Sequence, residues 1–161
     1  MNRIARKNQF SPDKKNIHGA VAVEMAILLI PLIVMAVGVA EFGRAIYQYN
    51  TLVKAVRDAG RLLSQHAPGS VNYATYTAEA RCLAVHGNVN CSGAQLAPGL
   101  TAGMVTITSS TTLSSAGTTI NLVEVGITGY RFDFVFNPLT FFGNSDTGIT
   151  FGPIQTTMRQ I

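Results

Sequence analysis

The feature that most constrains this chain is a long apolar run near its start, residues 19–40, with the sequence GAVAVEMAILLIPLIVMAVGVA. Its one charged residue is Glu24. A helix rises about 1.5 Å per residue, so about 20 apolar residues cross the roughly 30 Å hydrocarbon core of a bilayer. A secretory signal peptide has a shorter apolar core, followed by a cleavage site and unrelated sequence. The run therefore predicts a transmembrane helix over residues 20–40.

The excess positive charge of the chain lies before this helix. Residues 1–19 carry five Lys or Arg and one Asp, whereas the rest carries seven Lys or Arg and seven Asp or Glu. Lys and Arg stay on the cytoplasmic side of a membrane helix. We therefore expect a basic, disordered leader in the cytoplasm and a translocated domain over residues 41–161. No basic face with interleaved aromatic residues remains in that domain, which argues against a nucleic-acid partner.

Glu24 has two interpretations from its position alone. A carboxylate in an apolar span costs a few kcal/mol and is normally paired or functional, unless it reaches the polar interface by extending its side chain. Both readings are compatible with a site one turn into the run.

The residues around Glu24 favour the functional reading. Basic residues precede His18-Gly19, and Glu24 is the fifth residue after Gly19. This order resembles the class III processing signal of type IV pilin-like proteins. The resemblance implies that prepilin peptidase cuts between Gly19 and Ala20, and that Glu24 neutralises the new N-terminal amine of a neighbouring subunit.

A longer stretch resembles the TadE-like family of minor pseudopilins from the tight-adherence (Flp) pilus machinery. The matching features are VEMA at 23–26, Pro31, an EFGR motif and AVRDAGR at 55–61. The residues of interest are Glu41, Phe42, Gly43, Arg44, Arg57 and Arg61. The close resemblance covers the N-terminal third. It implies a structural protein of the bacterial inner membrane with a periplasmic domain, whose partners are prepilin peptidase, other Tad/Flp pilus subunits and inner-membrane assembly proteins.

Beyond the span the apolar pattern becomes amphipathic, which predicts that the helix continues over residues 41–65. The expected buried stripe repeats at spacings of three and four: Ala45, Tyr49, Leu52, Val56, Ala59 and Leu63. The pattern is compatible with two roles for this face: packing on the chain's own head domain alone, or packing on neighbouring subunits as well.

A second helix is predicted over residues 73–86, with Asn72 as its N-cap and Gly87-Asn88 as its end. Cys82, within this helix, and Cys91, in the loop after it, lie on the translocated side, where a disulfide between them is expected to link helix and loop. The alternative is a pair of unlinked buried thiols. Two cysteines are too few for a structural zinc site.

The chain after Gly103 changes to a period of two, which predicts strands within residues 104–158. These are residues 104–110, 120–128, 130–136 and 149–158, the last confined to a sheet edge by Pro153. Tyr130, Phe132, Phe134 and Phe136 share one face and are expected in the core. The predicted fold class is α+β: a long transmembrane helix continuing into the periplasm and packed on a small antiparallel β-meander head, similar to pilin-type heads.

No catalytic motif, phosphate-binding loop or metal-binding pattern is present in the sequence. We therefore expect neither an enzyme nor a cofactor. Two alternatives to a processed pseudopilin stay open. One is an uncleaved TadE-like anchor or adaptor of the cell envelope. The other is a periplasmic binding module in which the helix serves only as a tether and the strands hold a ligand or a peptide.

Overall fold

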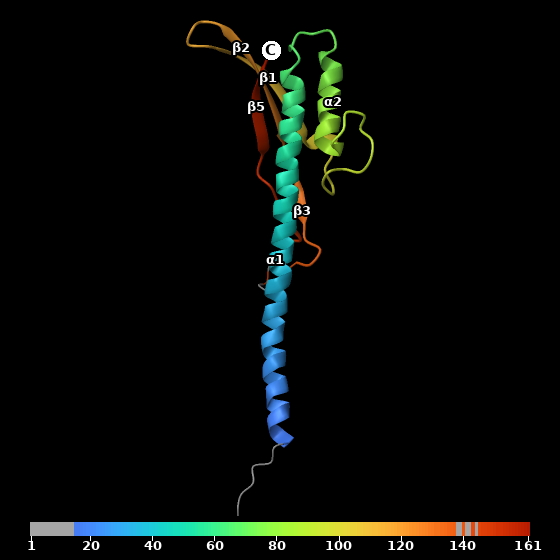
Figure 1. Ribbon diagram of the computed structural model, residues 1–161, viewed down its shortest axis with the longest axis vertical. Helices are drawn as coiled ribbons and strands as arrows, with labels where there is room; N and C mark the ends of the chain where they lie inside the picture. Colours follow the sequence, from blue (N-terminus) through green and yellow to red (C-terminus); the bar gives the residue numbers. More distant parts are fainter. Residues whose placement is uncertain (1–14, 138–139, 141–142, 144) are drawn as a thin grey trace, which may run out of the picture.

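The structure, a computed structural model, describes residues 15–137, 140, 143 and 145–161 of the chain. Its dominant element is α1, a single helix of 50 residues from Lys15 to Ser64 that forms the long axis of the molecule (Figure 1). The helix continues through Pro31 and Gly38, and at about 1.5 Å per residue it is about 75 Å long. Among the described residues, α1 is the helix that is long and apolar enough to cross a membrane.

The start of α1 differs from the prediction. Residues 15–18 were expected to belong to a disordered leader, but they form the first turn of the helix. No proline lies between Pro12 and Pro31, so no proline prevents the helix from beginning before Gly19. The rest of the basic leader lies outside the described residues.

The second helix, α2 (Tyr73–His86), coincides with the segment expected from the sequence. Asn72 is its N-cap residue, but its side chain makes no capping hydrogen bond; its backbone carbonyl instead accepts from the amides of Thr75 and Tyr76. Gly87 ends the helix in the left-handed conformation, at φ 74°, which glycine adopts without steric cost. The expected disulfide between Cys82 and Cys91 forms and links α2 to the loop that follows it.

The strands form two small antiparallel sheets. After a short 3-10 helix, η1 (Ala102–Met104), strands β1 (Val105–Leu113) and β2 (Thr119–Ile127) make a hairpin, and β5 (Ile154–Gln160) pairs with β2 to give the order β1-β2-β5. The register of the hairpin pairs Val105 with Ile127. Strands β3 (Arg131–Asp133) and β4 (Gly148–Thr150) form the second sheet. The α+β class with an antiparallel head is thus confirmed.

Two predicted strands differ in extent. The segment 130–136 forms a strand only over β3, and it pairs with β4 instead of joining the larger sheet. The predicted strand 149–158 is divided into β4 and β5, and Pro153 lies between them. Proline has no amide hydrogen to donate to a ladder, which explains the interruption.

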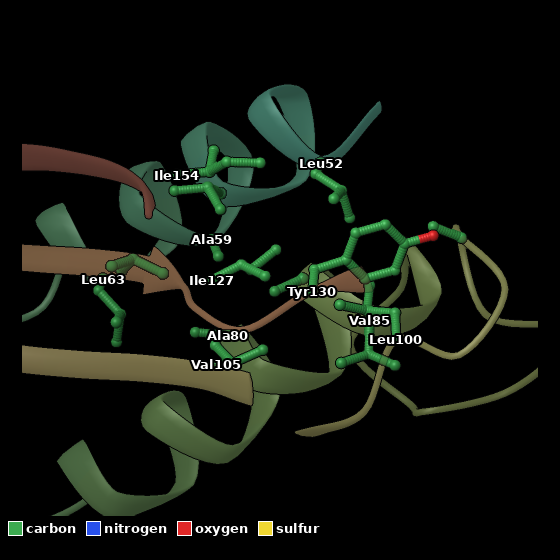
Figure 2. Close-up of a cluster of buried hydrophobic side chains, with 14 of the residues drawn as sticks. Leu52, Ala59, Leu63, Ala80, Val85, Leu100, Val105, Ile127, Tyr130 and Ile154 are labelled. Carbon is green, nitrogen blue, oxygen red and sulfur yellow. The ribbon is translucent and has the colours of Figure 1, made fainter. Parts of the chain in front are cut away.

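The hydrophobic core lies between the second half of α1, helix α2 and the larger sheet, as Figure 2 shows. On β2 the alternation places Val123, Val125 and Ile127 toward the helices, each at most 1 % exposed. Gly60 allows α1 and β5 to approach closely, because a Cβ there would lie 3.0 Å from Cγ2 of Thr156. Loop residues complete the core around Tyr130 and Leu100 (Figure 2).

The last residues of β5 cover the end of α1. The Nε2 of Gln160, a buried side chain, donates to the carbonyls of Leu63 and His66, each at 3.2 Å. The amide of Ile161 donates to the carbonyl of Ser64 at 3.1 Å. These bonds satisfy carbonyls that a helix end leaves without intrahelical partners.

Candidate functional site

The residues expected to act in processing and assembly lie on the bare half of α1, which the head does not cover (Figure 1). Gly19, Ala20 and Glu24 are exposed, and a Cβ added at Gly19 would meet no atom within 4 Å. None of the ion pairs between described residues involves Glu24.

The EFGR motif lies just beyond the predicted span and is divided between two faces of α1. Glu41, 8 % exposed, faces the head, and Arg44 is partly buried beside it. Phe42 is 53 % exposed and points away from the core, and a Cβ at Gly43 would meet no atom within 4 Å. Glu41 and Arg44 thus contact the head. Phe42 and Gly43 lie on the side of α1 that the head leaves open.

Arg44 joins α1 to the end of β3. Its Nη2 donates to Oε2 of Glu41 and to the carbonyl oxygen of Asp133, both at 2.7 Å. The guanidinium carbon lies 4.7 Å from the ring centroid of Phe132, a distance typical of cation–π contacts. The Oε2 of Glu41 also accepts from the amide of Val135, at 3.4 Å. We call this set of contacts, made by Glu41 and Arg44 with residues 132–135, the head clamp.

Electrostatics in the head clamp favour the charged form of Glu41. Burial opposes its ionisation, but the hydrogen bond from Arg44, the amide of Val135 and the positive charge of Arg44 outweigh burial. The pKa of Glu41 is consequently held below its ordinary value of 4.5. Glu41 and Arg44 thus form an ionised, hydrogen-bonded pair at the foot of the head.

A polar residue that the sequence pattern missed lies one turn above the clamp. Gln48 is buried, 8 % exposed, whereas Tyr49, expected in the core, is 44 % exposed. The hydroxyl of Tyr130 donates to Oε1 of Gln48 at 2.8 Å and lies 3.0 Å from the carbonyl of Pro98. Burial, followed by the negative charge of Asp133, raises the pKa of Tyr130. The sequence did contain a signal for the burial of Gln48, because this residue lies three residues after Ala45 and four before Leu52, which is the spacing of the buried face.

The aromatic face after β2 is buried at one end only. Tyr130 and Phe132 are at most 2 % exposed, Phe134 is partly buried, and Phe136 is 42 % exposed. On the other face, Arg131 and Asp133 form an ion pair with Nε 2.9 Å from Oδ1. The core prediction is therefore right for the first two rings and wrong for Phe136, because the chain leaves the sheet after Asp133.

Arg57 and Arg61 of the second family motif are exposed and make no ion pair among the described residues. Between them, Ala59 and Gly60 are buried and face the core. The motif therefore contains two kinds of residue. Ala59 and Gly60 are small and allow close packing on the core, whereas the two arginines remain in solvent.

A cavity of about 240 Å³ opens beside the head clamp and is lined by Arg44, Gln48, Pro98, Tyr130 and Arg131, among others. Its ionisable lining residues are Arg44, Arg131, Asp133 and Tyr130, and none of its lining residues is a cysteine, serine or histidine. Within the described part of the chain, no group of three or more His, Cys, Asp or Glu residues is placed to hold a metal ion.

Comparison with known proteins gives one match, to the family model described as TadE-like protein, over residues 19–61. No curated protein and no solved structure matches the chain. The matched segment contains Gly19, Glu24, the EFGR motif and both arginines of the second motif. The predicted resemblance is thereby confirmed for residues 19–61, which match the TadE-like family model.

Proposed function

We propose that this chain is a structural minor pseudopilin that contributes to assembly or anchoring of a Flp-type (tight-adherence) pilus. In this proposal residues 1–19 are a leader, residues 20–40 span the bacterial inner membrane with the N-terminus in the cytoplasm, and residues 41–161 form a periplasmic domain. The TadE-like match and the bare apolar half of α1 support it. The activity is assembly with other subunits, not catalysis.

The observation that carries the proposal is an apolar stripe on α1 that continues beyond the span and that the head leaves open. It consists of Val39, Phe42 and Ile46, which are 73 %, 53 % and 60 % exposed. Their spacing of three and four residues places them on one side of the helix. Such spacing is typical of a seam between packed helices. Contact with the helix of a neighbouring subunit would bury this stripe.

Glu24 is the residue proposed to direct incorporation. In the low dielectric of a bilayer, its carboxylate and the α-amine of a neighbour processed at Ala20 attract each other far more strongly than in water. Neither charge is stable there alone, because each loses its hydration. We expect Glu24→Ala to reduce co-purification with pilus subunits strongly, while head stability is unchanged because Glu24 does not contact the head. Normal pilus assembly by this variant would contradict the role.

Processing is tested by the N-terminal mass of the protein purified from membranes of a host with its prepilin peptidase. The proposal predicts a chain that begins at Ala20. Gly19→Val should keep residues 1–19 attached, since the peptidase site is expected to accept only a small residue there. A wild-type chain that retains its leader would favour the uncleaved anchor.

A second candidate function is a tethered binding module, which the free sheet edges favour. In the order β1-β2-β5 the outer strands are β1 and β5, and β1 carries no charge and no proline over its nine residues. Such an edge can accept an extended peptide by strand addition. This function would not require Glu24, so the Glu24→Ala variant distinguishes it from the pseudopilin.

A further inference from the structure

We propose that the head makes a second contact with the membrane, through an apolar tip formed by Val135 and Phe136. Val135 is 82 % exposed and Phe136 is 42 % exposed. They lie next to each other in a bend that follows β3 after one intervening residue, Phe134. The exposed part of each apolar side chain is unfavourable in water, because its burial would be stabilising.

The position of the tip identifies the lipid surface as its partner. The amide of Val135 donates to the carboxylate of Glu41, and Glu41 is the first residue after the predicted span. The tip is therefore held level with the end of the span. The interfacial layers add about 5–8 Å on each side of the hydrocarbon core, which corresponds to a few residues of helix. Figure 1 shows β3 at the end of the head that is nearest the bare half of α1.

The charges next to the tip do not oppose this placement. Glu41 is paired with Arg44 at 2.7 Å, and Asp133 is paired with Arg131 at 2.9 Å. Glu41, which contacts the tip, and Asp133, which is close to it in sequence, are thus each paired with an arginine. Aromatic side chains are enriched at this depth of the bilayer, where their rings contact both headgroups and acyl chains. Phe136 supplies such a ring, and the head clamp fixes its distance from the span.

Two other exposed apolar residues of the head lie away from the span. Val71 and Leu113 are 101 % and 72 % exposed, but they lie after α1 has ended and at the far end of the β1–β2 hairpin. Leu113 therefore provides an exposed control at the other end of the head.

The chain contains no tryptophan, so one substitution creates a unique fluorescent reporter. We would reconstitute full-length Phe136→Trp, Leu113→Trp and Leu28→Trp in phosphatidylcholine vesicles without bromine, and in vesicles with bromine either near the headgroup end of the acyl chains, for Phe136→Trp and Leu113→Trp, or near their terminal end, for Leu28→Trp at the middle of the span. Leu28→Trp reports the span on which the proposal rests. The expected result is blue-shifted, bromine-quenched emission from Phe136→Trp and Leu28→Trp, with unquenched, water-like emission from Leu113→Trp.

Three outcomes would overturn the proposal, and they are distinguishable. Quenching of Leu28→Trp but not Phe136→Trp, with water-like emission from the latter, leaves the span in place and removes the second contact. Blue-shifted but unquenched emission from Phe136→Trp means that protein, such as a second copy of the chain, covers the tip. Absence of quenching at Leu28→Trp means that the span itself is wrong. Val135→Trp repeats the test at the other residue of the tip, whose contact with Glu41 is made by its backbone amide and does not require the valine side chain.

Discussion

The two halves of α1 belong to one continuous helix but face different surroundings. Before Glu41 nearly every side chain is exposed, and apolar residues such as Leu28, Leu29 and Ile30 lie on different sides of the helix. After Glu41 the buried residues are confined to one face, which packs on α2 and the larger sheet. A helix that is apolar all round and bare is suited to lipid, whereas a one-sided apolar face is suited to a core. Both halves are helical, so helical propensity does not explain why their apolar residues are distributed differently. The surroundings of each half explain it.

The largest effect that separates the halves is expected from leucine truncation. Leu52 is fully buried, so Leu52→Ala should lower the free energy of unfolding of the head by about 2–5 kcal/mol, through lost burial and a residual cavity. Leu28→Ala, at a residue 65 % exposed, should leave it unchanged. Urea denaturation of the full chain in detergent, followed by circular dichroism, measures both. An equal loss in the two variants would mean that the bare half supports the head.

A smaller effect is expected at the glycines of α1. Gly60→Val should destabilise the head by about 1–3 kcal/mol, because the new side chain would overlap Thr156 and Met158 of β5. Gly43→Val is the matched control, since a Cβ there meets no atom within 4 Å; we expect a change within about 0.5 kcal/mol. Thermal unfolding of the two variants compares them directly. Similar unfolding temperatures would show that β5 does not pack on Gly60 as described.

The smallest effect is expected at the boundary between the halves. Arg44→Gln removes the ion pair to Glu41 and the contact with Phe132, and should reduce the protection of β3 by about 1–2 kcal/mol. Hydrogen exchange of the amides of residues 132–135 measures this local change. Arg57→Gln, at an exposed arginine without an ion pair among the described residues, should leave their exchange unchanged. Unaltered exchange in Arg44→Gln would contradict the head clamp.

Much of the fold was predictable because it rests on local patterns. The long apolar run, the amphipathic continuation and the hairpin follow from periodicities of 3.6 and 2. The spacing of three and four residues also placed Leu52, Val56, Ala59 and Leu63 correctly in the core. The prediction was wrong at Tyr49, because an apolar residue was assigned to the core although Gln48 occupies the buried position beside it. The burial of Gln48 is stabilised by Tyr130, 82 residues away, whose hydroxyl donates to its side-chain amide oxygen.

The division of the sheets was not predictable, because it depends on pairings between distant segments. The sequence placed Pro153 in an edge strand, but only the structure shows that β4 before it pairs with β3 and β5 after it pairs with β2. The site was predictable in part for the same reason. The EFGR motif identified Glu41 and Arg44 as important, but their contacts with residues 132–135 join segments about ninety residues apart.

The covering of the α1 end by β5 has a consequence for the order in which a nascent chain can fold. Gln160 bonds to Leu63 across a separation of 97 residues, so α1 and α2 are both synthesised long before the strand that completes their packing. Until β5 arrives, the side of α1 around Gly60 is uncovered and the carbonyl of Ser64 lacks its bond from the amide of Ile161. The growing chain therefore passes through a stage in which the helix presents its future core face as well as its open stripe. Contacts with other subunits that require a finished head can form only after this stage.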